Sequence, residues 1–117
     1  MSPKKNPLNL NPLQLRTLTL LQALARIPGH ARPAGEDGAL LVGNVPPMQG
    51  DHFHLGEAVV ATRDATGLYN PAVWVVLERK GLIKSFFPDA AALTPAGLAY
   101  ETGLAETVLH RADHAAH

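Results

Sequence analysis

Two groups of histidines have the residue types and spacing that could bind a metal ion. The first is His52 and His54, which alternate along a stretch that reads as a strand, with Asp51 before them and Glu57 after them. Imidazoles two residues apart on a strand share a face, and with a carboxylate they could bind zinc or another transition metal. If they bind a metal, Glu57 is the better third ligand, because a regular strand would point Asp51 to the opposite face. Ordinary surface histidines are the alternative interpretation.

The second group is His110, His114 and His117, which are spaced to lie on one side of a predicted last helix, one turn after Glu106. We expect this side to face solvent, at a C-terminus (110–117) that frays, so metal binding there would be adventitious. Catalysis would need an open coordination position and a positioned general base, and neither spacing provides them. We therefore predict a protein that is not an enzyme and has no cofactor.

Length and composition place these residues in one globular domain spanning 1–117. The chain has 117 residues, 46% of them hydrophobic and 17% charged, which is enough for one hydrophobic core. It contains no cysteine, so disulfides and thiolate zinc sites are excluded. Its apolar runs are far shorter than the roughly 20 residues of a membrane span, and its first residues lack a secretion-signal pattern. We expect a cytoplasmic protein with no membrane partner.

The charges are balanced in number but not along the chain. Ten basic and ten acidic residues give a net charge of zero, which argues against a protein that binds mainly to phosphates. Residues 1–35, which begin with a predicted N-terminal arm (1–10), have no acidic residue, and all ten acids lie in residues 36–117. Either the basic first helix packs across an acidic remainder, or a basic arm and helix are presented to an acidic partner.

Three helices are predicted by one entry signal, in which an apolar residue, an Asn or Thr cap and a proline follow each other. The cap and proline pairs are Asn11-Pro12, Asn70-Pro71 and Thr94-Pro95. Gln14 completes a capping box in the first helix, which is predicted over 12–26. The second is predicted over 71–80 and ends at Gly81, and the last begins at Pro95 with a possible break at Gly103.

The strands are predicted from short apolar runs between turn residues. The run ALLVGNV (39–45) reads as a strand and pairs in a β-hairpin with the segment HFHLGEAVVAT (52–62), after a loop over 28–38. A second hairpin is predicted from a strand over 82–87 and a return strand over 90–93. The fold class is therefore α+β, with three main helices and two β-hairpins.

Part of this pattern resembles the winged-helix superfamily of helix-turn-helix proteins. The resemblance is carried, over about residues 58 to 103, by ATRDATGL, by NPAVWVVLERKGLI and by ALTPAGLAYETG. It implies a winged-helix-like fold in which the helix over 71–80 could enter the major groove of DNA and a β-hairpin wing follows. The stretch VVATRDA reads as a strand as well as a helix, so the first helix of the motif stays open. The implied function is that of a small DNA-binding transcriptional regulator.

The resemblance also implies which side chains would touch DNA. They are Tyr69, Asn70, Arg79, Lys80 and Lys84, joined by Lys4 and Lys5 of the basic arm. Asn70 could read an adenine edge and the cations could contact phosphates. Because the net charge is zero and the basic residues are concentrated in the first third, any binding should be weak and steeply salt-dependent. The alternatives are that Asn70 is only a helix cap and that Arg79 and Lys80 form a solvated helix end.

The same helix carries bulky apolar residues that favour a different function. We expect Trp74 to lie at least partly in the core, but Tyr69, Trp74 and Val75 cannot all point inward. Another protein, a second copy of the chain or the N-terminal segment could cover what remains. Two alternatives to DNA binding therefore stay open: a protein-interaction domain on this scaffold, and a metal or small-ligand-binding protein using the His52/His54 hairpin. An apolar exposed face on the helix over 71–80 would favour the first.

Overall fold

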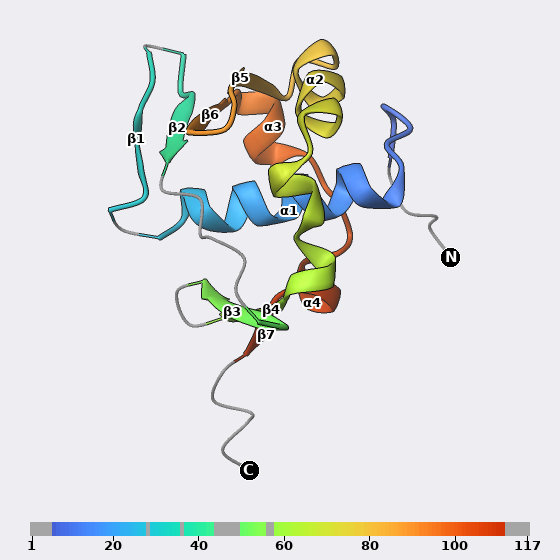
Figure 1. The fold of residues 1–117 in the computed structure, drawn as a ribbon. Coiled ribbons are helices and arrows are strands. Elements are labelled where there is room, and N and C mark those ends of the chain that lie inside the picture. The colour runs from blue at the N-terminus through green and yellow to red at the C-terminus, as the bar shows by residue number, and fades with distance from the viewer. Residues whose placement is uncertain (1–5, 28, 36, 44–49, 56–57, 112–117) are drawn as a thin grey trace.

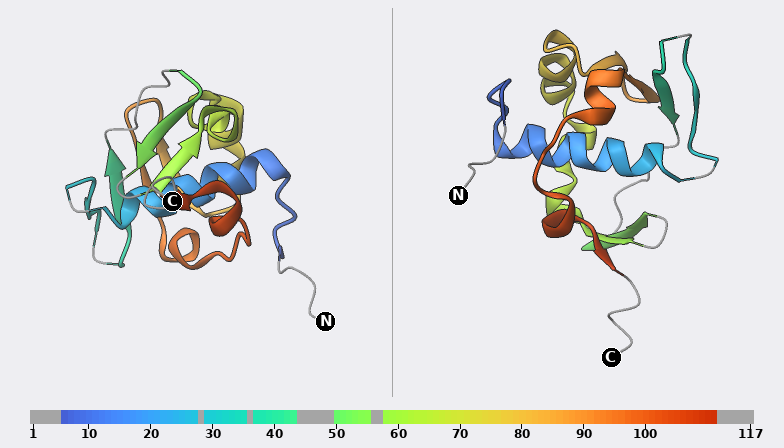
Figure 2. Two further views of the ribbon diagram at one scale, coloured as in Figure 1. Left: turned by 90° about the horizontal axis from the view of Figure 1, so that it is seen from below. Right: turned by 180° about the vertical axis from the view of Figure 1, so that it is seen from behind.

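The helix α1 (Pro12–Ala25), half of whose residues are buried, lies at the centre of the fold (Figure 1). The structure is a computed structural model that describes residues 6–27, 29–35, 37–43, 50–55 and 58–111. Within these residues the chain is α+β, with two antiparallel sheets. Figures 1 and 2 show the two sheets on opposite sides of α1.

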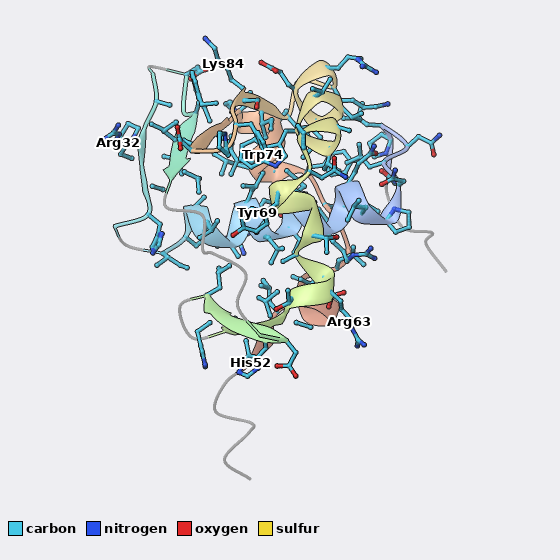
Figure 3. All side chains as sticks on the ribbon, viewed as in Figure 1. Arg32, His52, Arg63, Tyr69, Trp74 and Lys84 are labelled. Carbon is cyan, nitrogen blue, oxygen red and sulfur yellow. The ribbon has the colours of Figure 1, made fainter. Side chains whose placement is uncertain are left out.

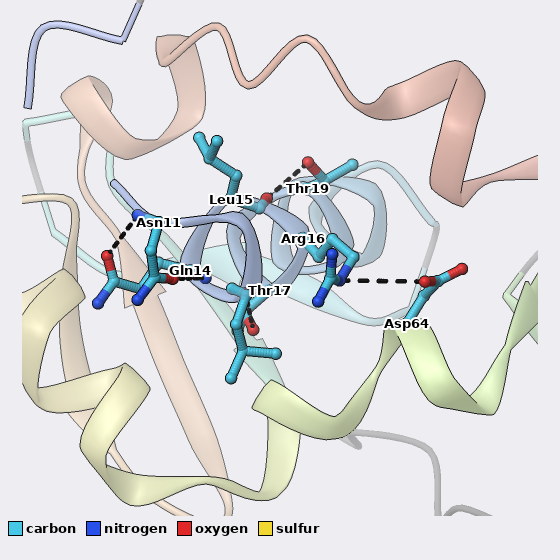
Figure 4. A network of polar contacts seen from close by, with 8 residues as sticks. Asn11, Gln14, Leu15, Arg16, Thr17, Thr19 and Asp64 are labelled. Carbon is cyan, nitrogen blue, oxygen red and sulfur yellow. Dashed lines mark hydrogen bonds and ion pairs between the residues drawn. The ribbon is translucent and has the colours of Figure 1, made fainter. Parts of the chain in front are cut away.

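The predicted capping box begins α1. The Asn11 side chain accepts a hydrogen bond from the Gln14 backbone N–H at 2.8 Å, and the Gln14 side chain accepts one from the Asn11 N–H at 2.9 Å (Figure 4). Six consecutive residues, 17–22, are buried, so α1 is enclosed on nearly all sides. The hydroxyls of Thr17 and Thr19 donate to backbone carbonyls one turn earlier, at 2.8 Å each, which satisfies them in the core.

Sheet A is four-stranded, in the order β1-β2-β6-β5. Its strands are β1 (Ala31–Pro33), β2 (Leu40–Gly43), β5 (Ile83–Phe86) and β6 (Ala90–Leu93). The predicted second hairpin is present as β5 and β6. The predicted first hairpin is wrong, because β2 pairs with β1 and β6. Residues 31–33, assigned to a loop by their sequence, form β1, a short edge strand where Pro33 is tolerated.

Sheet B is three-stranded, in the order β3-β4-β7. Its strands are β3 (His52–Leu55), β4 (Ala58–Ala61) and β7 (His110–Arg111). The partner of β3 is therefore the strand that directly follows it, not the run ALLVGNV. Buried Leu55 and Val60 join the core from this side.

The stretch VVATRDA and the residues up to the second long helix contain a strand end and no α-helix. They form the end of β4 and two short 3-10 helices, η1 (Thr62–Asp64) and η2 (Thr66–Tyr69). Helix α2 (Pro71–Arg79) follows, with the side chain of Asn70 accepting a hydrogen bond from the Ala72 N–H at 3.0 Å. Lys80 is the C-cap residue, and Gly81, with φ of +80°, follows it in the left-handed conformation predicted for the end of this helix.

The predicted last helix is divided into α3 (Pro95–Ala99) and α4 (Ala105–Val108). Thr102 lies between them, buried, with its hydroxyl 2.6 Å from that of Thr19 on α1. The chain leaves the helix at Tyr100, whose backbone is extended, and Gly103, the residue at which a break was predicted, has a positive φ before α4 begins. The expectation for His110 is therefore wrong, since it lies in β7 and not on a helix face. His114 and His117 fall outside the described residues.

Residues 6–10, within the predicted arm, pack against the fold. Leu10 is buried, and the Leu8 N–H donates to the Tyr100 hydroxyl at 3.2 Å. The Lys80 ammonium donates to the Leu8 carbonyl at 2.8 Å. Lys4 and Lys5 lie outside the described residues. In the part of the chain that is described, no helix is both long and apolar enough to cross a membrane.

Candidate functional site

The exposed side of α2 is the surface on which the functional hypotheses differ. We call it the α2 face. Its exposed residues are Pro71, Ala72, Val75, Glu78 and Arg79. Val75, 51% exposed, lies at the middle of the helix. The first half of this face offers no polar side chain, and the second half carries one acid and one base. The other side of α2 packs into the core through Val73, Trp74 and Leu77.

Trp74 is fully buried, which confirms the expectation that it lies in the core. Its indole N–H donates to the Gly67 carbonyl at 3.1 Å. Its ring meets that of Phe87 edge to face, with centroids 5.1 Å apart. Figure 3 shows Trp74 between α2 and the β5–β6 hairpin. A side chain at position 67 would collide with Thr17, so glycine allows η2 to approach α1.

Several residues predicted to touch DNA already have intramolecular roles. Asn70 caps α2, and Lys80 binds the carbonyl of Leu8. The ammonium of Lys84 lies 5.8 Å from the centre of the Phe86 ring. Arg79 is exposed at the end of α2.

Tyr69 is the remaining member of that set. It is 37% exposed, and partial burial raises the pKa of its phenol. Figure 3 shows it near α1, at the junction of η2 and α2. Its hydroxyl therefore stays protonated to a higher pH than that of a free tyrosine.

One ion pair joins the basic first third of the chain to the acidic remainder. Arg16 on α1 lies 3.9 Å from the carboxylate of Asp64 on η1, with 31% and 23% of the two side chains exposed (Figure 4). A partly exposed pair at this distance stabilises little, because solvent screens it. It nevertheless fits the interpretation in which the first helix packs across acidic elements.

The histidine hairpin has a different geometry from the predicted one. His52 and His54 are both exposed on β3, with ring centroids 5.8 Å apart. Asp51 does not point to the opposite face, because it precedes the strand in a turn and its carboxylate lies 3.0 Å from the His52 Nδ1. This hydrogen bond lowers the pKa of the Asp51 carboxyl. Glu57 lies outside the described residues. Among those described, no three His, Cys, Asp or Glu residues are grouped so as to hold a metal ion.

A hollow on sheet A contains polar residues that the sequence did not single out. Its volume is about 280 Å³. It is lined by Gly29, His30, Ala31, Arg32, Leu41, Gly43, Asp89 and Ala90. The β1–β2 hairpin and the β5–β6 turn, which are far apart in the chain, contribute these residues, and long-range pairing of β2 with β6 brings them together.

Comparison of the chain with protein-family models, with curated proteins and with solved structures found no significant match. Function must therefore be inferred from the geometry of the residues themselves.

Proposed function

We propose that the chain is a non-enzymatic, winged-helix-like module whose α2 face binds another protein. The observation that carries this proposal is the apolar first half of the α2 face, with Val75 at its centre and half exposed. The order of the elements supports the winged-helix-like part. A helix and a strand (α1, β2) precede α2, the hairpin β5–β6 follows it, and β6 pairs between β2 and β5.

A protein suits this face better than a DNA groove does. The floor of the major groove presents hydrogen-bond donors and acceptors, and Pro71, Ala72 and Val75 offer few groups to match them. Apolar side chains of this kind are typical of the centre of a protein interface, with charged residues at its rim. Arg79 is at the rim here. The expected partner has an apolar patch bordered by a carboxylate.

Site-specific photocrosslinking in cells of the host organism tests the proposal. The photoreactive residue p-benzoylphenylalanine replaces Val75, which is exposed and should tolerate it, and a control chain carries it in place of exposed Glu101. We expect a protease-sensitive adduct of defined mass at position 75, absent at position 101 and lost when Ala72→Arg is added. No adduct at position 75, or the same adduct at both positions, would contradict the proposal.

Duplex DNA is the second candidate partner, and one observation favours it. Arg79 and Lys84 are both exposed, at the end of α2 and on the strand that follows it. They could contact phosphates, together with Lys4 and Lys5. A fluorescence titration of random duplex at about 50 and 200 mM salt should show weak binding that falls steeply with salt and weakens in Arg79→Gln and Lys84→Gln variants. Failure to bind at the lower salt would eliminate this candidate.

A further inference from the structure

The strand register of sheet A places charged residues at both edges of its outer face. Paired residues share a face, so Arg32, Leu41, Ala92 and Lys84 form one row across all four strands. The opposite face points toward α1 and carries Val42, Ala91 and Leu93, which are fully buried. The row with Arg32 and Lys84 is therefore on the side of sheet A away from α1.

The hollow described above opens on this outer face. Gly43 pairs with Ala90 next to the row, and these small residues leave room above the sheet. Its volume of about 280 Å³ is near the lower end for small-molecule pockets, which typically have 300–1,000 Å³. The space suits a small metabolite rather than a large cofactor.

Polar groups without partners converge on this space. Arg32 lines it from β1 and Asp89 from the β5–β6 turn, and neither forms an ion pair with a described residue. His30 also lines it, and among the described residues its buried Nδ1 has no hydrogen-bond partner. An arginine and an aspartate that line one hollow and have no described ion-pair partner suit a ligand that carries an anionic group and a hydrogen-bond donor.

We propose that this hollow binds a small phosphate monoester that also carries a hydroxyl group. The planar guanidinium of Arg32 suits two phosphate oxygens at once, and the carboxylate of Asp89 suits a hydroxyl donor. Strands β1 and β6 are separated by β2, so their backbones lie roughly 10 Å apart. A ligand with the phosphate at one end and the hydroxyl at the other can span this distance together with the long Arg32 side chain. The proposal is independent of the role of the α2 face.

Three probes distinguish the contact of Arg32 with a phosphate from the contact of Asp89 with a hydroxyl group. They are glycerol 3-phosphate, inorganic phosphate and glycerol, each titrated into the full ¹⁵N-labelled chain and followed by NMR. We expect glycerol 3-phosphate to bind most tightly, inorganic phosphate more weakly and glycerol not at all. The shifts should fall in residues 29–32, 41–43 and 89–90. Arg32→Gln should weaken binding of both phosphates by about tenfold or more, the factor expected from losing a charged hydrogen bond.

The second variant tests the hydroxyl contact. Asp89→Asn should reduce the preference for glycerol 3-phosphate over inorganic phosphate, because the amide is a weaker acceptor and carries no charge. Arg63→Gln is the matched control, since Arg63 is an exposed arginine on η1 that Figure 3 shows on another side of the molecule from Arg32. Equal weakening by Arg63→Gln and Arg32→Gln would overturn the proposal in favour of non-specific attraction. Absence of shifts in the three segments, or an unchanged preference in Asp89→Asn, would also overturn it.

Discussion

Replacing Trp74 by alanine should destabilise the fold more than most single substitutions can. The variant removes a fully buried indole, its edge-to-face contact with Phe87 and its hydrogen bond to the Gly67 carbonyl. That carbonyl also accepts a hydrogen bond from the Asn70 N–H at 3.2 Å, so it keeps one partner. The main loss is therefore the apolar contact and the cavity left behind.

The expected cost is about 3–5 kcal/mol of unfolding free energy, the range measured for large aromatic residues replaced by alanine in protein cores. A domain of this size loses roughly 4 °C of melting temperature per kcal/mol, so the midpoint should fall by about 12–20 °C. Trp74→Phe keeps an aromatic ring beside Phe87 and should cost less, about 1–2 kcal/mol for the lost hydrogen bond and the smaller ring.

Urea and thermal unfolding, followed by far-UV circular dichroism, measure these costs without relying on tryptophan fluorescence. Val75→Ala is the matched control on the same helix, because Val75 is exposed and its loss should change stability by about 0.5 kcal/mol or less. A cost below about 1 kcal/mol for Trp74→Ala, or a cost equal to that of Val75→Ala, would refute the placement of Trp74 in the core.

The remaining predictions concern a glycine, a cap and a carboxyl group. Gly97→Ala should cost at least the about 1–3 kcal/mol of an overpacked core in urea unfolding, because a Cβ there would collide with the Leu82 carbonyl; a wild-type midpoint would contradict this. Asn70→Ala should cost about 1 kcal/mol in the same assay and Asn70→Asp clearly less, since only the second keeps the cap of α2; equal costs would exclude a capping role. In an NMR titration the pKa of Asp51 should lie below its ordinary value and rise in His52→Ala. Because the folded pKa is lowered, the hydrogen bond to His52 stabilises the folded state above the unfolded pKa, and this stabilisation is lost as the pH falls through the folded pKa. An unchanged pKa of Asp51 in His52→Ala would exclude the hydrogen bond as the cause of the lowered pKa.

The starts of helices were predictable because their signals are local. Asn11 and Gln14 are three residues apart, and Asn70 directly precedes a proline, so capping is determined within one turn of the chain. The β5–β6 hairpin was predictable for the same reason, since a short turn joins its strands. The expected burial of Trp74 was also confirmed.

Contacts between distant segments were not predictable in this way. Leu40 pairs with Leu93 across the sheet, and nothing in the sequence near either residue identifies the other. The sequence therefore predicted the wrong pairing partner for β2, which pairs with β1 and β6. The contact of Thr102 with Thr19 on α1 is likewise a tertiary contact that no local pattern indicates, whereas the break at Gly103 was predicted.

In the candidate sites too, local features could be predicted from the sequence and long-range contacts could not. The apolar character of the α2 face could be predicted from Val75 and its neighbours, but the hydrogen bond from Lys80 to the carbonyl of Leu8 could not. The contact between Asp51 and His52 was also missed, because the regular strand assumed for Asp51 begins one residue later. The hollow beside Arg32 depends on the order of strands in sheet A, and that order is set by long-range pairing.

The central position of α1 has a consequence for how the molecule opens. No strand of sheet A is paired with a strand of sheet B in the described part of the chain, whereas α1 contacts β2, β6 and α2 on one side and η1 and α4 on the other. Local opening of α1 would expose the core toward both sheets at once, so its middle amides should exchange with solvent only when the whole domain unfolds. Sheet B contributes fewer buried side chains to the core, among them Leu55 and Val60, so its opening exposes less of it. The slowest-exchanging unit of the protein is therefore expected to be a single helix, with the two sheets as separate, faster units around it.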